Sequence, residues 1–528
     1  MVPTRKRLAS CGAAIPTIVA ISASLCLAAP LAAQDAPAPR EGSADAALTA
    51  FLVAAHPEFE NVSWTVADWD GAPVTARLPD RHALAQGPRP DPDAPVRLAP
   101  DVSATGLSLD LPWRDTRIAS ARAHLVGDYM VLEGFTLANA AGTLGADALI
   151  LSQDALRVLG TAVAGGATGA SAPADVVFDG LAIEVRRAAP DGSSREFASR
   201  FSAARLTLLG LTADVAEEDG PPTLDLAGLD GVGLSGAARF AGSAEFTLDA
   251  LAFRGSPRAL TQAAQAVIRL AEAPTGEDAR AASLSITGFS FRARRPGSDP
   301  AVFDIAEASI RANFGEAASR LAIVVDDLRA SVALLAGTPA EATARTIAAN
   351  ATAATGAPDS EGGPFLRLDL EADAAMREDR LRLRLACLAA PGVVDLATEI
   401  DVTLPEGTDL SALDPRALLG ARVRGLSLAA VDHGLGALLR AATGSSVSEL
   451  VEAAATRVLE RGIGIPAPVA RLTLPPLVSA VATFDEEGSL AAQAPLAAPA
   501  PLALAAFLSS AAPVAPGSEA LAGCGARP

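Results

Sequence analysis

Hydrophobic and polar residues alternate along most of the chain, and the alternation slips by one residue at recurring places. Val176 and Phe178 are in one phase, whereas Leu181 and Ile183 are in the other. Because successive side chains of a β-strand point to opposite faces, these runs predict strands with one apolar face. The same slip recurs in three further segments, residues 246–253, 284–291 and 323–328.

Each slip has two possible structural explanations. Asp179-Gly180 suits a two-residue hairpin turn, at which the chain would reverse. Alternatively, a β-bulge within one long strand adds a residue and resets the phase. We favour the bulge, because Asp249-Ala250 and Asp326-Asp327 occupy the same place without the glycine that such a turn requires. Phe178 and Leu181 are therefore predicted to lie in one continuous strand.

Two stretches repeat the same unit of strand, glycine, strand, charged turn and strand. They are Val176–Leu211 and Leu284–Phe314, in which Gly180 and Gly288 occupy equivalent positions. Their turns, APDGSS and RPGSDP, are rich in residues that favour chain reversal. The chain is therefore predicted to repeat one supersecondary unit.

Segments with a helical spacing of apolar residues follow the predicted strand pairs. They are residues 43–56, 153–164, 256–273 and 339–354. A helix that follows a hairpin covers one face of the sheet. The predicted fold class is α+β, mostly β, with repeated antiparallel bulged β-hairpins in a long curved sheet, helices covering one face and a helical C-terminal region.

The C-terminal region changes from strands to helices. Ser446 and Glu449 predict a capping box at the start of a helix that ends at Gly462. Residues 488–517 carry no charge and are long enough to span a bilayer, but their prolines argue against a spanning helix. A short packed helix at Leu502–Leu508 and a proline-rich tail are predicted instead.

The N-terminus has the features of a secretion signal. Basic residues at 5–7 precede an apolar, small-residue segment, and Ala33 is a suitable cleavage position. A retained membrane anchor is the alternative, but Pro16 and Pro30 favour cleavage. We therefore expect a periplasmic protein with no membrane span after cleavage. Five regions are predicted: the signal peptide at 1–33, a small helix and strand segment at 34–72, a proline-rich linker at 73–100, the repeated region at 101–425 and the helical region at 426–528.

The acidic composition restricts the class of partner. The formal net charge is −19, which argues against nucleic acid and against unaided docking on anionic lipid headgroups. Lys6 is the only lysine and lies in the predicted signal. The mature chain would therefore have no lysine for a Schiff base or a P-loop.

No motif predicts catalysis, a metal site or a cofactor. The four histidines lack metal-ligand spacing, and neither H-E-x-x-H nor G-x-S-x-G occurs. Gly231–Gly236 matches G-x-G-x-x-G, but a β-type pattern follows where a dinucleotide site needs a helix. Asp432 before His433 is interpreted as the cap of a helix rather than as half of a catalytic pair. We therefore expect no enzyme activity, no metal and no cofactor.

Two cysteines, Cys387 and Cys524, remain after removal of the predicted signal. An even pair in an oxidising compartment is suggestive of a disulfide, and Cys524 lies in a tail that could reach Cys387. The alternative is a buried Cys387 and a free Cys524 in the tail. The sequence leaves both possibilities open.

The stretch LSLAAVDHGLGALLRAATG, followed by LTLPPLVSAVATF, resembles the C-terminal part of β-rich exported envelope proteins of Gram-negative, especially alphaproteobacterial, genomes, which are of unknown function. The upstream strands resemble in pattern the bulged repeats of bacterial envelope proteins of the AsmA and YdgA-like kind. This resemblance implies long sheets that curl into a lipid-lined groove, and it transfers no catalytic residue. The chain departs from the pattern in its more numerous helices and, if the signal is cleaved, in lacking an inner-membrane anchor.

Three functions are compatible with these features: a non-enzymatic periplasmic carrier of lipid or another apolar ligand, a structural or partner-binding envelope protein, and a hydrolase with an unrecognised site. A sheet bent by bulges and covered by helices on one side leaves a concave apolar face, where ligand sites form. The candidate groove residues are Phe178, Leu181, Phe246, Phe253, Phe289 and Phe291. The alternative for these six is a core beneath the helices.

Overall fold

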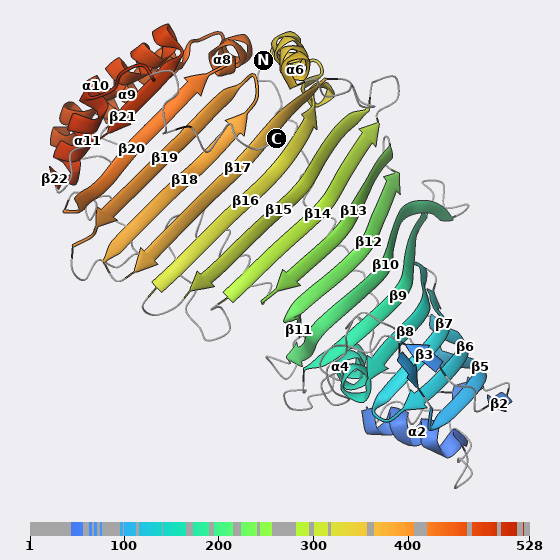
Figure 1. Cartoon of the computed structure of the whole chain (residues 1–528). Coiled ribbons are helices and arrows are strands. Elements are labelled where there is room, and N and C mark those ends of the chain that lie inside the picture. The colour runs from blue at the N-terminus through green and yellow to red at the C-terminus, as the bar shows by residue number, and fades with distance from the viewer. Residues whose placement is uncertain are drawn as a thin grey trace. The chain divides into compact units, whose positions relative to one another are not determined.

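The computed structural model describes most of the chain in two units, Met1–Gly231 and Val232–Pro528 (Figure 1). The described residues are 44–55, 63–65, 68–70, 74–76, 96–98, 100–111, 116–139, 141–164, 173–188, 195–214, 223–239, 243–255, 281–294, 300–314, 318–355, 364–377, 379–405, 420–461, 467–493, 498–514 and 521. The predicted signal at 1–33, the predicted helix at 256–273 and Cys524 lie outside them.

Unit 1 is an antiparallel sheet in which consecutive strands are neighbours. Its main strands are β5 (Val102–Leu111), β6 (Thr116–Val126), β7 (Tyr129–Asn139), β8 (Gly142–Ser152), β9 (Ala174–Ala188) and β10 (Arg195–Asp214). Three short strands extend it, with β1 (Ser63–Thr65) and β2 (Asp68–Asp70) on β5 and β11 (Thr223–Asp225) on β10. A separate two-stranded sheet, β3 (Val74–Ala76) and β4 (Val96–Leu98), lies within the range predicted as a linker, and Val74 is buried.

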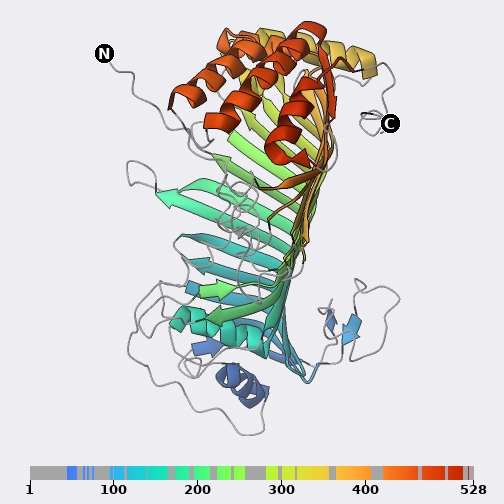
Figure 2. The same cartoon turned by 90° about the vertical axis from the view of Figure 1, so that its left-hand side faces the viewer.

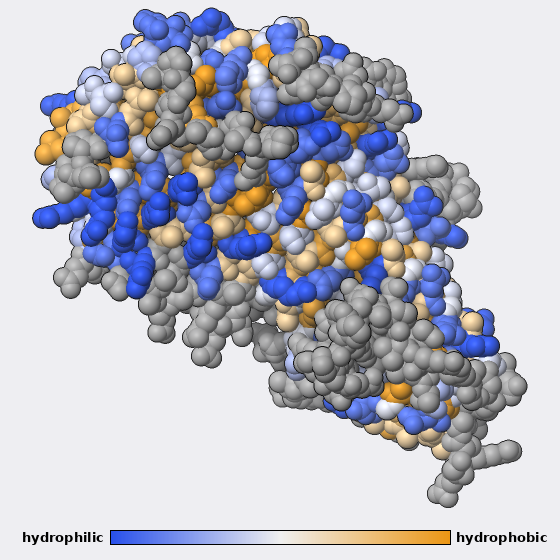
Figure 3. Space-filling model, in the orientation of Figure 1, coloured by the Kyte–Doolittle hydropathy of each residue, from blue (hydrophilic) through white to orange (hydrophobic). Residues whose placement is uncertain are grey.

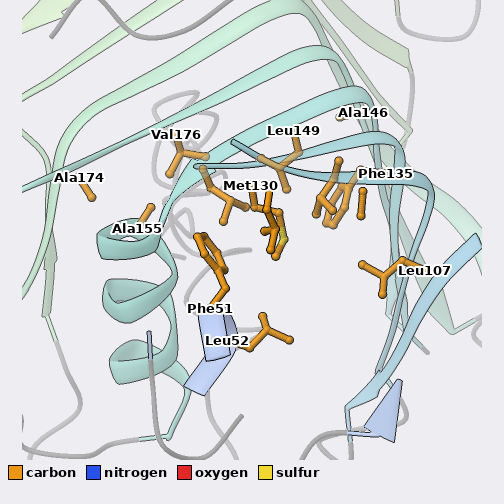
Figure 4. Close-up of a cluster of buried hydrophobic side chains, with 14 of the residues drawn as sticks. Phe51, Leu52, Leu107, Met130, Phe135, Ala146, Leu149, Ala155, Ala174 and Val176 are labelled. Carbon is orange, nitrogen blue, oxygen red and sulfur yellow. The ribbon is translucent and has the colours of Figure 1, made fainter. Parts of the chain in front are cut away.

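Two helices cover one face of the unit 1 sheet. They are α2 (Ala44–Ala55) and α4 (Gln153–Ala164), within one residue of their predicted bounds. Phe51 and Leu52 of α2 and Ala155 of α4 pack with Leu149 and Val176 of the sheet in one buried cluster (Figure 4). This face of unit 1 is therefore a filled hydrophobic core.

Unit 2 is a longer antiparallel sheet built the same way. Its strands are β13 (Ser243–Arg254), β14 (Ala281–Arg294), β15 (Ala301–Phe314), β16 (Ala318–Ser331), β17 (Phe365–Arg377), β18 (Arg380–Ala390), β19 (Val394–Thr403) and β20 (Arg422–Asp432). Two short strands, β21 (Ser489–Gln493) and β22 (Ala498–Pro499), pair with β20. Strand β12 (Gly228–Arg239) contains the boundary between the units and the whole of Gly231–Gly236, so that motif lies in a strand.

Most helices of unit 2 follow its last long strand and lie to one side of the sheet (Figure 2). They are α8 (Leu435–Thr443), α9 (Val447–Arg461), α10 (Ala467–Glu487) and α11 (Ala500–Ser509), whereas η4 (Val332–Leu335) and α6 (Glu341–Thr355) follow β16. The predicted capping box is present at the start of α9, because Glu449 N–H donates to Ser446 Oγ and Ser446 N–H donates to Glu449. Helix α11 contains the predicted Leu502–Leu508 segment.

The phase slips lie inside continuous strands, as predicted. Phe178 and Leu181 are both in β9, and Gly180 between them has a φ of 62°. The register on either side of Gly180 is unchanged with respect to β8 and β10. Neighbouring strands therefore change phase at the same level, so β9 has no extra residue at Gly180 and the bulge predicted there is not present. An extra residue does occur in β16, between Val325 and Leu328, which fits a bulge.

The predicted fold class is confirmed: the chain is mostly β, its sheets are antiparallel and curved, and its C-terminal region is helical. Within the described part of the chain, none of the helices has the length and apolar character needed to cross a bilayer.

Candidate functional site

One face of the unit 2 sheet is apolar across strands β14–β18. Residues directly opposite each other on antiparallel neighbours share a face. Leu284, Ile310 and Ile323 are opposed in this way, and the row continues through Ala372 to Leu385. We call nine large side chains from this row and the two beside it the apolar face: Leu284, Ile286, Ile310, Leu321, Ile323, Val325, Leu370, Leu383 and Leu385.

The apolar face is only half-buried. Every one of its nine large side chains keeps part of its surface exposed. In unit 1, by contrast, Leu149 and Val176 beneath the helices are 5% and 2% exposed. A contiguous apolar surface that is not fully covered is a feature of binding sites rather than of filled cores. The apolar face is therefore the candidate ligand surface of this chain.

Phenylalanines extend the apolar face beyond the phase slip of β13–β15. Phe291 lies opposite Phe246 on one side and Phe303 on the other. The ring centroids of Phe246 and Phe289 are 6.5 Å apart and stacked, and those of Phe289 and Phe303 are 6.2 Å apart at a steep angle. Such aromatic pairs stabilise each other beyond the area that they bury.

The six predicted groove residues do not form a single cluster. Phe178 and Leu181 belong to unit 1, where Phe178 packs against the core beneath the helices and Leu181 is 2% exposed. Phe253 of unit 2 is also buried, whereas Phe246, Phe289 and Phe291 are half-buried on the extension of the apolar face. The aliphatic residues that make up most of this face were not among the predicted groove residues, although their alternation in the sequence is regular.

Helices cover the apolar face at one end of the sheet. Phe484 of α10 and Phe507 of α11 are buried against β19–β21 through neighbours that include Ala430, Leu490 and Val423. At another place Ala344 and Ala348 of α6 pack with Leu366 at the start of β17. The half-buried part, on β14–β18, lies outside these clusters.

The opposite face of the same strands is charged. Arg384 lies between Asp373 and Glu399 in one row, on the side of β18 opposite its leucines. Arg382 forms an ion pair with Glu399 at 3.0 Å, and Arg320 forms one with Asp373 at 3.0 Å. Figure 3 shows hydrophilic residues gathered over β17–β20. We call the face of β14–β20 that lies opposite the apolar face the charged face.

A serine, a histidine and a glutamate come together in unit 1, which no sequence motif indicates. Ser103 Oγ is 2.7 Å from His124 Nδ1, and His124 Nε2 is 3.7 Å from a carboxylate oxygen of Glu133. These are the residue types of a nucleophilic triad. However, Ser103 and His124 are 2% and 1% exposed, so in this conformation no substrate can reach the hydroxyl.

His433 lies at a strand-to-helix junction, as predicted. The carboxylate of Asp432 accepts hydrogen bonds from the backbone N–H groups of Gly434, Leu435 and Gly436 and so caps α8. His433 Nε2 is 2.9 Å from Asp395 of β19. The histidine therefore pairs with an acid on the neighbouring strand and not with Asp432.

The described residues contain no group of acids, histidines and cysteines close enough to hold a metal ion. Cys387 in β18 is disulfide-bonded, and its partner lies outside the described part of the chain. Pairing with Cys524 remains a prediction.

No protein-family model matches the sequence, and no curated protein matches it significantly. The resemblance to exported envelope proteins therefore remains a prediction. Function has to be argued from the apolar face and its surroundings.

Proposed function

We propose that this chain is a non-enzymatic periplasmic protein that binds a lipid or another apolar ligand on the apolar face of unit 2. The supporting observation is the half-burial of the nine aliphatic side chains on β14–β18, beside fully buried clusters under α10 and α11. Apolar surface in contact with water costs about 25 cal/mol per Å². An acyl chain laid along these rows would remove that cost.

The shape of the surface suits an extended ligand. Rows of opposed residues run across the strands, and neighbouring strands are ~4.8 Å apart, so the row from Leu284 to Leu385 spans about 19 Å. Single aliphatic side chains without polar groups give affinity without strong selection among acyl chains. The expected ligand is therefore an apolar chain, with little selection for its other chemical features. The predicted secretion signal and the resemblance to envelope proteins support a periplasmic location.

Two neighbouring residues of β18 allow a matched test. Leu385 belongs to the apolar face, and Arg384 points to the charged face. Leu385→Asp should abolish binding of a fluorescent fatty acid, because a carboxylate would have to be desolvated beneath the ligand. Arg384→Gln, which places no third acid between Asp373 and Glu399, should leave binding within about twofold of the wild type, and circular dichroism should show both variants folded.

The proposal would be wrong if the two variants bound the fatty acid equally well. If Leu385→Asp does not fold, Leu385→Asn provides the same comparison with an uncharged polar group. Equal binding by the folded variants would favour a structural or partner-binding role instead.

A hydrolase is the second candidate, and Ser103 beside His124 is the observation that favours it. Such an activity needs the buried hydroxyl to become accessible. A fluorophosphonate probe that labels the wild type but not Ser103→Ala would support it, and absence of labelling would remove it.

A further inference from the structure

Four arginines gather at one end of β17–β20 on the charged face. Arg377 lies opposite Arg380, Arg380 lies opposite Thr403, and Thr403 lies opposite Arg422. Arg424 donates a hydrogen bond from Nε to Thr403 Oγ1 at 2.6 Å. With ~4.8 Å between neighbouring strands, the row spans about 15 Å. We call Arg377, Arg380, Arg422 and Arg424 the arginine cluster.

The arginine cluster carries more positive charge than its surroundings neutralise. Arg380 forms an ion pair with Asp401, which is 6% exposed. Asp379, in the turn between β17 and β18, is exposed and forms no ion pair with the described arginines. Arg377 and Arg422 are exposed and have no hydrogen bond or ion pair among the described residues. Two guanidinium groups are therefore available to a ligand.

The positive field is evident at Asp401, the buried acid of the cluster. The pKa of Asp401 lies below its usual value because Arg380 donates hydrogen bonds to the carboxylate, and the charges of Arg380, Arg382 and Arg424 add to the effect. In addition, Arg377 and Arg380 are like charges directly opposite each other, an arrangement that destabilises a sheet. An anion bound between them would relieve this repulsion.

The chemistry of the arginine cluster selects an oxyanion. The planar guanidinium group binds phosphate and carboxylate oxygens in pairs, and several such groups side by side favour the more highly charged phosphate. A long polyanion is disfavoured, because the chain has a net charge of −19 and the charged face also bears Glu307, Asp326 and Asp369. At physiological ionic strength the Debye length is about 8 Å. A single phosphate group at the arginine cluster therefore interacts mainly with the arginines, because the charges of more distant acids are screened.

We propose that the arginine cluster binds the phosphate group of an anionic phospholipid at a membrane surface. All four arginines of the cluster are exposed, so a lipid headgroup can reach them. The net acidic charge of the chain predicts weak docking on anionic lipid, and this cluster is the local exception to it. The site does not depend on the apolar face.

Co-sedimentation of the purified protein with phosphatidylglycerol or phosphatidylcholine vesicles tests the proposal. Each arginine near an anionic surface contributes roughly fivefold to binding. Arg377→Gln combined with Arg422→Gln should therefore weaken binding to phosphatidylglycerol by about 30-fold. Arg311 is an exposed arginine on the charged face outside the cluster. Arg311→Gln is therefore the matched control and should change binding less than threefold.

The proposal is overturned if the double variant binds phosphatidylglycerol like the wild type, if phosphatidylcholine binds equally well, or if Arg311→Gln weakens binding as much. Inorganic phosphate at a physiological concentration should not displace the vesicles; full displacement would assign the cluster to free phosphate instead. Leu385→Asp should leave vesicle binding unchanged, which separates this site from ligand binding on the apolar face.

Discussion

Single residues determine where the strands change phase. Gly180 and Gly288 have φ values of 62° and 65°, which glycine adopts at little cost. A Cβ atom at either position would lie about 2 Å from a carboxylate oxygen, of Asp147 and Asp249 respectively. The glycines could be predicted from the slip in the alternation. The aspartates could not, because they lie on neighbouring strands and the pairing of strands is not encoded in local sequence.

Gly288→Ala is expected to destabilise unit 2 by about 2–3 kcal/mol, from the positive φ and from the displacement of Asp249. Gly337→Ala is the matched control, because Gly337 also has a positive φ, of 78°, but open space around the position of a Cβ. It should cost about 1–2 kcal/mol. Urea denaturation compares the two variants, and equal losses would show that contact with Asp249 has no energetic consequence.

The ion pair of Asp401 with Arg380 should make the stability of the protein depend on pH. Because the folded pKa of Asp401 is lowered, the pair contributes stability at neutral pH that is lost as the pH falls below about 4. Asp401→Asn should therefore be less stable than the wild type at pH 7, and the difference should shrink at pH 3. Thermal denaturation at the two pH values measures this. A difference that stayed constant with pH would contradict the account.

At the scale of elements, most helices and strands could be predicted from periodicity and end signals. The capping box at Ser446 and Glu449 and the helix around Leu502–Leu508 are confirmed. The periodicity of the sequence could not predict which strands the helices cover. Helices α10 and α11 pack over β19–β21, and the apolar face on β14–β18 stays half-buried. That distribution depends on contacts between segments far apart in the chain.

Two leucines of unit 2 should differ in their contribution to stability. Leu490 is 7% exposed and packs against Phe484, whereas Leu385 is half-buried on the apolar face. Leu490→Ala should lower the free energy of unfolding by about 2–4 kcal/mol and Leu385→Ala by about 1 kcal/mol, because a half-exposed side chain loses less on truncation. A loss at Leu385 as large as that at Leu490 would identify the apolar face as core.

At the scale of the whole molecule, the six predicted groove residues do not form one site, because they belong to two different units. Phe178 and Leu181 pack in unit 1, and the half-buried phenylalanines lie in unit 2. The copies of the repeat are similar in sequence, but the elements that pack over each copy differ. Which elements pack over a copy depends on the tertiary structure of the whole unit. The buried pair of Ser103 and His124 was missed for a related reason, since register alone brings them together.

The cysteines provide a prediction for the complete chain. Cys387 is disulfide-bonded, and Cys524 is the one other cysteine beyond the predicted signal. Thiol titration of the denatured, non-reduced mature protein should therefore give no free thiol, and Cys524→Ser should give one. Such a bridge contributes about 2–4 kcal/mol. Two free thiols in the wild type would exclude it.

A lipid carried on the apolar face should purify with the protein. Solvent extraction of the protein purified from the periplasm, followed by mass spectrometry of the extract, measures this lipid. We expect acyl lipid at about one molecule per chain in the wild type and at least tenfold less in Leu385→Asp, a change equivalent to about 1.4 kcal/mol of binding free energy. A wild-type protein that is folded and free of lipid, and that takes up none from added vesicles, would contradict this expectation.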